Sequence, residues 1–118
     1  MLFRVDGSSE LSLADQIAVQ VRAGVVDGSL APGERLPPAR ELAKALQVNM
    51  HTVLRAYAAL REEGLIQMRQ GRGAFVHQDA GPGLIRIVEL AEQLMAEARK
   101  LGMSQQEIVR LIGETKYA

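Results

Sequence analysis

Hydrogen-bonding side chains gather at the start of a predicted helix that begins after Asn49. On a helical wheel, one face near its amino terminus carries Asn49, His51, Thr52 and Arg55. The opposite face is apolar and carries Val53, Ala56, Tyr57 and Leu60. The polar side chains are of the kind that meet phosphates and base edges in the major groove. A solvated helix face is the plain alternative, because polar residues are usual on surfaces.

Residues 36–64 contain the element that positions this face. An earlier helix is predicted from the helical spacing of Ala39, Leu42, Ala43 and Leu46. Pro37 and Pro38 suit its start, and Asn49 suits the N-cap of the following helix. Only residues 47–49 separate the two helices, so the helices must cross at a steep angle. This pattern predicts a helix-turn-helix.

A β-hairpin is predicted after Gly64, which suits the end of the second helix. Two apolar runs, residues 65–68 and 74–76, flank a glycine-rich basic turn with Arg69, Gly71, Arg72 and Gly73. The hairpin has the position of the wing in a winged helix, and its glycines permit a close approach to another surface. A plain hairpin turn is the alternative. A phosphate-binding loop is disfavoured, because no helix and no GK[ST] sequence follows.

Residues 11–77 resemble the amino-terminal winged helix of GntR-family transcription regulators. The resemblance rests on GSLAPGERLP at 28–37, RELA at 40–43, the TV, RAY and EGLI fragments within 52–66, and GRGAFV at 71–76. The remainder resembles the YtrA-type subfamily, whose members carry a small two-helix tail instead of a large ligand-binding domain. The resemblance implies a transcription regulator that binds double-stranded DNA.

Family DNA contacts transfer only to positions that match. Arg40 stands where the family has an arginine, and the resemblance implies that it contacts the DNA backbone. Thr52, Gly71 and Gly73 also match the family pattern at their positions. The chain departs from the family at Met50 and Leu54, where an arginine is common. Together with the helix face and the wing, the expected DNA-binding residues are Arg40, Asn49, His51, Thr52, Arg55, Arg69, Gly71, Arg72 and Gly73. We expect His51 and Arg55 to reach base edges.

The segment before the helix-turn-helix is predicted to support it. Residues 1–10 resemble an extended arm in which Phe3 and Val5 could pack or add a strand. Ser12 then begins a helix with one apolar stripe, and the helix ends at 27–28. A short strand near 34–36 can join the hairpin to make a three-stranded sheet.

The carboxyl-terminal tail is predicted to be two helices after a linker at 78–83. The first, about 84–101, has apolar residues at alternating spacings of three and four, which is the pattern of helix pairing: Leu84, Ile87, Ala91, Leu94, Ala98 and Leu101. Ser104 and Glu107 predict a capping box for a second helix at 104–113. Two such helices cannot bury an apolar face alone. They pack on their own winged helix or, as we favour, against a second copy.

Composition narrows the remaining classes. The chain of 118 residues has no cysteine and only two histidines, which disfavours disulfides, thiol catalysis and a metal site. We expect no cofactor, no membrane segment and a cytoplasmic location. No catalytic triad or paired carboxylates can be recognised, so an enzyme is not expected. A small effector is possible, but the short tail offers no evident pocket.

The charge distribution favours DNA binding although the net charge is zero. Residues 34–77 hold seven basic and four acidic groups, whereas the segments on either side are net negative. The sequence thus predicts a mostly α fold with a small β-sheet: residues 1–77 form a winged helix-turn-helix DNA-binding domain, and 84–118 form a dimerisation tail. The predicted function is a sequence-specific repressor that binds an inverted-repeat operator as a homodimer. A winged-helix module for protein interaction is the alternative.

Overall fold

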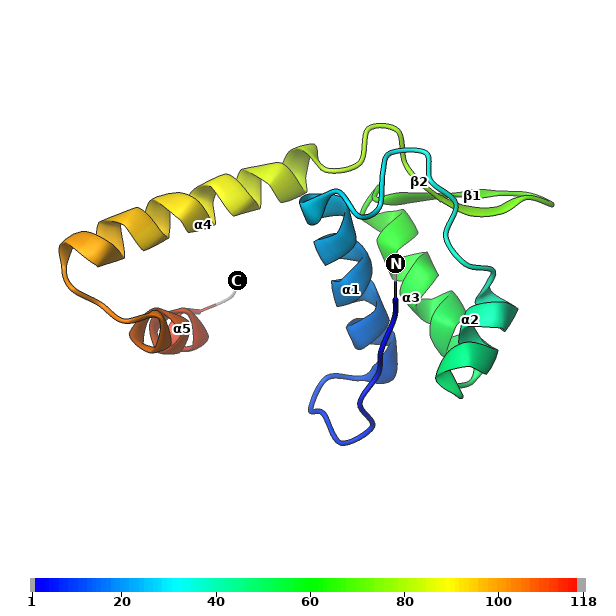
Figure 1. Ribbon diagram of the computed structural model, residues 1–118, viewed down its shortest axis with the longest axis horizontal. Helices are drawn as coiled ribbons and strands as arrows, with labels where there is room; N and C mark the ends of the chain where they lie inside the picture. Colours follow the sequence, from blue (N-terminus) through cyan, green and yellow to red (C-terminus); the bar gives the residue numbers. More distant parts are fainter. Residues whose placement is uncertain (1, 117–118) are drawn as a thin grey trace. The chain divides into compact units, whose positions relative to one another are not determined.

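The computed structural model describes residues 2–116 and contains five helices and one hairpin within them (Figure 1). The elements, in chain order, are α1 (Leu13–Asp27), α2 (Ala39–Leu46), α3 (Met50–Glu62), β1 (Ile66–Arg69), β2 (Gly73–Val76), α4 (Pro82–Lys100) and α5 (Gln105–Glu114). They divide into two compact units, Met1–Pro82 and Gly83–Ala118, called here the winged-helix unit and the tail. The predicted fold, mostly α with a small β-sheet, is confirmed.

Three helices enclose the core of the winged-helix unit. The amphipathic stripes of α1 and α3 place their branched and aromatic side chains between the helices, where water is excluded. The most deeply buried of these side chains are Ile17, Val21, Val53, Tyr57 and Leu60. In Figure 1, α1 and α3 lie side by side, and the hairpin projects beyond them from the end of α3. The unit therefore holds α3 rigidly along one side.

Side-chain caps and a tight turn fix where the helices begin. Ser12 accepts a hydrogen bond from the backbone N–H of Asp15 at the start of α1. Asn49 does the same for His51 at the start of α3, over 2.8 Å. Between α2 and α3, Gln47 has φ 56°, which is the left-handed conformation that ends a helix abruptly. The predicted three-residue turn of the helix-turn-helix is confirmed.

The wing is a two-stranded antiparallel sheet with one bridged neighbour. Ile66 pairs with Val76 and Arg69 with Gly73, so the strands are in register over four residues. The predicted third strand is only one bridged residue long, because Arg35 alone forms a ladder pair with Phe75. The proline pair at 37–38 ends this segment, since proline cannot donate to a ladder.

The amino-terminal arm packs on α1 without forming a strand. The amides of Gln16 and Gln20, one turn apart, each donate to and accept from the arm backbone, at Asp6 and Arg4 respectively. Phe3 is 7% exposed and belongs to the core. The two side-chain amides thus replace the main-chain partner that a strand would need.

The long carboxyl-terminal helix begins earlier than predicted. Helix α4 starts at Pro82 rather than at 84, because proline is well suited to the first helical turn, where its missing N–H costs nothing. The capping box of Ser104 and Glu107 is present at the start of α5. Ala98 and Ile108 are buried in the tail. From residue 2 to residue 116, no helix is long and apolar enough to cross a membrane.

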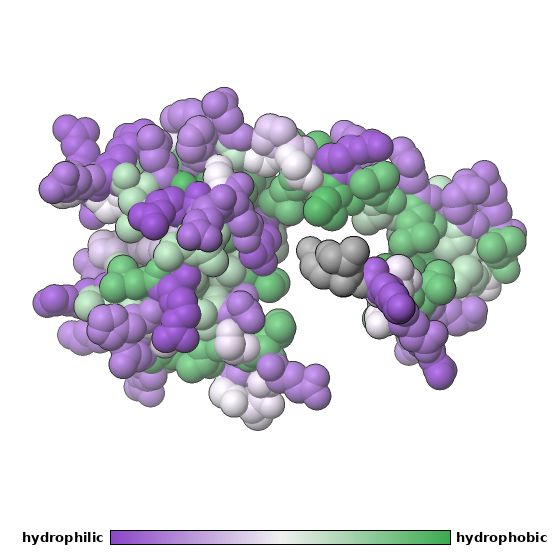
Figure 2. All heavy atoms as spheres, turned by 180° about the vertical axis from the view of Figure 1, so that it is seen from behind, coloured by the Kyte–Doolittle hydropathy of each residue, from purple (hydrophilic) through white to green (hydrophobic). Residues whose placement is uncertain are grey.

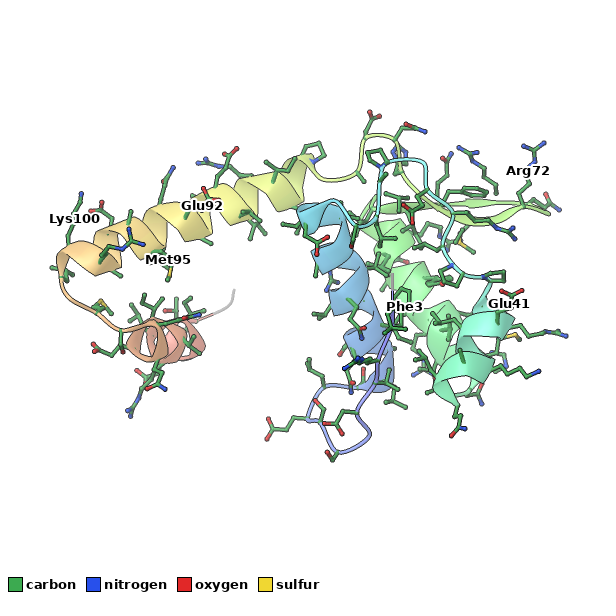
Figure 3. The ribbon with its side chains drawn as sticks, viewed as in Figure 1. Phe3, Glu41, Arg72, Glu92, Met95 and Lys100 are labelled. Atoms are coloured by element: carbon green, nitrogen blue, oxygen red, sulfur yellow. The ribbon has the colours of Figure 1, made fainter. Side chains whose placement is uncertain are left out.

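Much of the apolar surface of the tail stays exposed. Figure 2 shows hydrophobic residues along one side of α4 and hydrophilic residues along the other. Met95 and Lys100 project to opposite sides of this helix (Figure 3). The large exposed apolar side chains are Ile85, Ile87, Leu90, Leu94, Met95 and Leu101, with Val109, Leu111 and Ile112 on α5.

Candidate nucleic-acid interface

The polar face of α3 is open to solvent. His51 and Arg55 are exposed, Thr52 is half-buried, and all three lie in the first two turns of α3. The opposite face is fixed in the core by Val53 and Leu60, which are fully buried. The helix therefore presents hydrogen-bonding groups outward from a rigid base, which is the arrangement needed to enter a groove.

Asn49 has a structural task as well as a place beside this face. Its side-chain carbonyl oxygen accepts from the His51 N–H, so that oxygen is already used in capping α3. The amide NH₂ of Asn49 retains two donors, and the residue is exposed. These donors are the groups through which Asn49 can reach a phosphate, which only accepts hydrogen bonds.

Arg40 lies in the first turn of α2, exposed, and a buried tyrosine holds this turn in place. Tyr57 of α3 donates a hydrogen bond of 2.6 Å to the backbone carbonyl of Pro37, just before α2. Burial raises the pKa of the Tyr57 hydroxyl above its usual range, so the group stays a neutral donor. The hydrogen bond joins α3 to the segment that carries Arg40.

The basic residues of the wing lie at its tip. The guanidinium of Arg69 lies over the Phe75 ring, with 4.6 Å from its central carbon to the ring centroid. Arg72 lies in the turn between the strands and points away from the helices (Figure 3). Gly71 and Gly73 have φ values of 74° and 108°, which side chains rarely adopt, so both glycines are required by the turn.

Arg35 is an exposed basic residue of the wing that the sequence prediction did not include. A Cβ atom built on Gly73 would lie 3.3 Å from its Nε, so the glycine makes room for the guanidinium. Since Arg35 forms a ladder pair with Phe75, its side chain shares the face of the sheet that carries Arg69. Alternation of inward and outward side chains over 34–36 could have indicated that Arg35 faces the same way as Arg69, but three residues are too few to show an alternation.

The guanidinium groups of this region form no ion pair with the part of the chain that the structure describes. Within residues 2–116, the winged-helix unit contains one ion pair, which joins Arg22 and Glu63. None involves the basic residues of the candidate interface, which are Arg35, Arg40, Arg55, Arg69 and Arg72. Their positive charges are therefore available to an anionic ligand such as a phosphate backbone.

The winged-helix unit also contains a hollow of about 390 Å³. Its lining mixes apolar and charged side chains and includes Phe3, Leu30, Glu34, Arg35 and Glu41. The hydrogen-bonding residues at the start of α3 do not line it. It therefore lies between the arm, the segment before α2 and the first turn of α2, and it shares Arg35 with the candidate interface but not His51 or Arg55.

The residues predicted to form the dimer seam do not all lie on the surface. Ile87 and Leu101 are 63% and 79% exposed, and Leu94 is 37% exposed. Ala91 is exposed and Leu84 is half-buried. Ala98 is 4% exposed and is already covered within the chain.

A second hollow, of about 480 Å³, runs along α4 and is lined by Ile87, Val88, Ala91, Glu92, Met95, Ala96 and Arg99.

Comparison with known proteins gives matches to the winged-helix unit alone and to nearly the whole chain. The family model of "Bacterial regulatory proteins, gntR family" matches residues 13–76, from the start of α1 to the end of β2. The "HTH-type transcriptional repressor YtrA" of Bacillus subtilis is 30% identical over 118 residues, covering 96% of this chain and 91% of that protein. The similarity to YtrA thus includes the tail.

Two solved structures are similar in fold. "YtrA from Sulfolobus acidocaldarius, a GntR-family transcription factor" superposes with a TM-score of 0.61 at 35% identity, covering 92% of this chain and 91% of the other. A DNA-binding domain of AraR, solved in complex with operator ORX1, gives a TM-score of 0.57 at 26% identity. That match covers 64% of this chain and 95% of the AraR chain.

Proposed function

Because the chain belongs to the gntR family of bacterial regulatory proteins, we propose that it is a repressor that binds operator DNA as a dimer. Like its named relatives, it is a transcription regulator and not an enzyme. The observation that carries the proposal is the exposed polar face of α3, above all His51 and Arg55. Beside it lies a wing whose arginines form no ion pair within residues 2–116. Its place of action is the cytoplasm, where a bacterial operator lies.

The DNA contacts follow from the position of each group. Helix α3 enters the major groove with its amino-terminal turns, where His51 and Arg55 meet base edges. Thr52 and the Asn49 amide donate to bases or phosphates nearby. Arg40 binds a phosphate from α2, and Arg69 and Arg72 bring the wing to the adjacent backbone or minor groove, where Gly71 and Gly73 allow a close approach.

The tail pairs two copies. The apolar side chains of α4, Ile87 and Leu94 among them, remain in water when one chain is considered alone. A contiguous apolar surface of this kind is characteristic of an interface, and an apolar hollow along the same helix can receive a partner side chain. The seam consists of Leu84, Ile87, Ala91, Leu94 and Leu101, without the buried Ala98. Two-fold symmetry then predicts an operator with an inverted repeat.

The test combines binding with assembly state. Fluorescence anisotropy is measured against a random duplex and against a pool selected for binding, each at several salt concentrations, while sedimentation measures the mass of the protein without DNA. We expect a dimer, selected sites that are inverted repeats, and an affinity that falls steeply with salt. A monomer that binds no duplex at low salt would overturn the proposal and favour a protein partner for the α3 face.

A further inference from the structure

An exposed leucine interrupts the polar face of α3. Leu54 is 37% exposed, whereas the apolar residues on the core side of this helix, Val53 and Tyr57, are 0% and 1% exposed. Exposed leucines are common on protein surfaces and carry no meaning by themselves. The position of Leu54 distinguishes it, because it lies on the part of the surface proposed to enter the major groove.

Helical geometry places Leu54 among the proposed base-reading groups. It follows His51 by three residues and precedes Ala58 by four, and residues three and four apart lie next to each other on a helix. Arg55 is on the same side of α3 and is exposed. His51, Leu54, Arg55 and Ala58 thus form one patch, with an apolar half beside a hydrogen-bonding half.

The chemistry of the major groove limits what an apolar side chain can recognise there. Base edges in that groove present hydrogen-bond donors and acceptors, except for the C5-methyl group of thymine. A leucine that covered a donor or acceptor would remove its water and return no hydrogen bond, which is unfavourable. A leucine against the methyl group buries apolar surface on both sides, which is favourable.

We propose that Leu54 is a specificity-determining residue that reads a thymine through its C5-methyl group, with Ala58 as the neighbouring apolar contact. The inference rests on the proposed function, because α3 must enter the groove for the contact to form. Each half of a two-fold operator then requires one thymine beside Leu54. The adjacent bases are read by the hydrogen-bonding side chains of the same patch.

The test removes the methyl group and nothing else. Duplexes are made from the sequence selected by the wild-type protein, and each thymine in turn is replaced by deoxyuridine at the symmetric position of both half-sites. Loss of one methyl contact, at about 0.8 kcal/mol for a buried carbon group, weakens binding about fourfold, and loss of both weakens it about fifteenfold. We expect this loss at one symmetric pair of thymines within reach of α3.

Variants connect the loss to Leu54. In Leu54→Ala, the thymine and deoxyuridine duplexes should bind equally at that position, whereas Leu54→Met, which keeps an apolar side chain of similar volume, should retain a preference for thymine. Leu11→Ala is the matched control, because Leu11 is a 50% exposed leucine of the same unit that lies before α1. It should keep the full preference. Circular dichroism confirms that each variant is folded.

The outcomes separate the inference from the proposed function. Binding to the selected duplex with no sensitive thymine, or with a sensitivity that persists unchanged in Leu54→Ala, would overturn the role of Leu54 and leave DNA binding intact. Failure to bind any duplex at low salt would overturn the proposed function, and this inference with it.

Discussion

Arg22 of α1 and Glu63 at the end of α3 form a two-point ion pair across 41 residues of sequence. The Nε atom of Arg22 donates to one carboxylate oxygen over 3.0 Å, and the terminal nitrogen donates to the other. Two bonds at once fix the angle between the groups as well as their separation. The carboxyl end of the proposed recognition helix is therefore tied to α1.

This pair predicts a pH-dependent stability. The hydrogen bond from Arg22 holds the pKa of the Glu63 carboxyl below its ordinary value of 4.5. A lowered pKa in the folded state stabilises the fold above the unfolded pKa, and this contribution is lost as the pH falls through the folded value. Wild type should exceed Glu63→Gln in unfolding free energy by about 0.5 kcal/mol near neutrality, because both side chains are partly exposed. The difference should disappear well below pH 4.5.

Urea denaturation at several pH values measures that difference. Asp6 and Asp27 also have lowered pKa values, but both are present in the two proteins, so their contributions cancel. Arg22→Gln should behave like Glu63→Gln, and the double variant should lose little more than either. A difference that is unchanged at low pH would show that the ion pair is not its source.

The hydroxyl of Tyr57 should contribute to stability without contributing to recognition. Tyr57→Phe leaves the half-buried Pro37 carbonyl without its donor, so we expect a loss of about 1 kcal/mol in unfolding free energy. Equilibrium denaturation with an unchanged m-value would confirm that only stability has changed. DNA affinity below the transition should stay within about twofold of wild type, because the hydroxyl does not reach the surface.

Arg40 and Arg55 should differ in the kind of binding that they support. Arg40→Ala should weaken the selected duplex and random duplex by the same factor, because phosphates carry no sequence information. Arg55→Ala should weaken the selected duplex more, by about tenfold relative to random DNA, which corresponds to loss of a base contact. Anisotropy titrations on both duplexes decide between them. Equal losses in Arg55→Ala would remove that residue from base reading.

Arg35 and Arg69 should act through charge, since they lie on one face of the wing sheet and have no acidic partner within residues 2–116. Each phosphate contact contributes about 0.9 to the slope of log affinity against log salt. Arg35→Ala should therefore lower the slope by about that amount per subunit, on any sequence. Arg61→Ala is the control, because Arg61 lies in the last turn of α3. An unchanged slope for Arg35→Ala would exclude a phosphate contact.

Charge placed on the apolar side of α4 should separate the subunits. Ile87→Glu puts a carboxylate into the proposed seam, where it would lose water without gaining a partner, so dimerisation should weaken at least about tenfold. Ile85→Glu is the matched control, since Ile85 is 55% exposed and lies off the predicted seam. Sedimentation of both variants measures the effect. Equal behaviour of the two would place the interface elsewhere.

Local patterns predicted most of the winged-helix unit because its elements are short and strongly marked. Asn49 both caps α3 and ends the turn, and Gly64 with φ 78° follows the end of the same helix. These features act over a few residues, so the sequence displays them directly. The helix-turn-helix and the hairpin are confirmed on this basis.

Contacts between distant segments were beyond that kind of prediction. Arg35 bridges to Phe75, and Arg22 pairs with Glu63, only after tertiary packing brings them together. The start of α4 was misplaced because Pro82 and Gly83 have the composition of a linker, although proline fits the first turn of a helix. The burial of Ala98 depends on how the chain folds after α4, which the spacing of apolar residues does not specify.

The glutamine contacts to the arm set a lower limit on where this unit can be trimmed. A fragment cut to the family-matched residues 13–76 would lose Phe3 from the core and leave the amides of Gln16 and Gln20 without the arm backbone. Leu30 and Leu36, which line the hollow beside Phe3, would gain solvent contact. We therefore expect a fragment that keeps the arm to be more stable than the family-matched segment alone, and protease digestion should spare the arm until α1 itself opens.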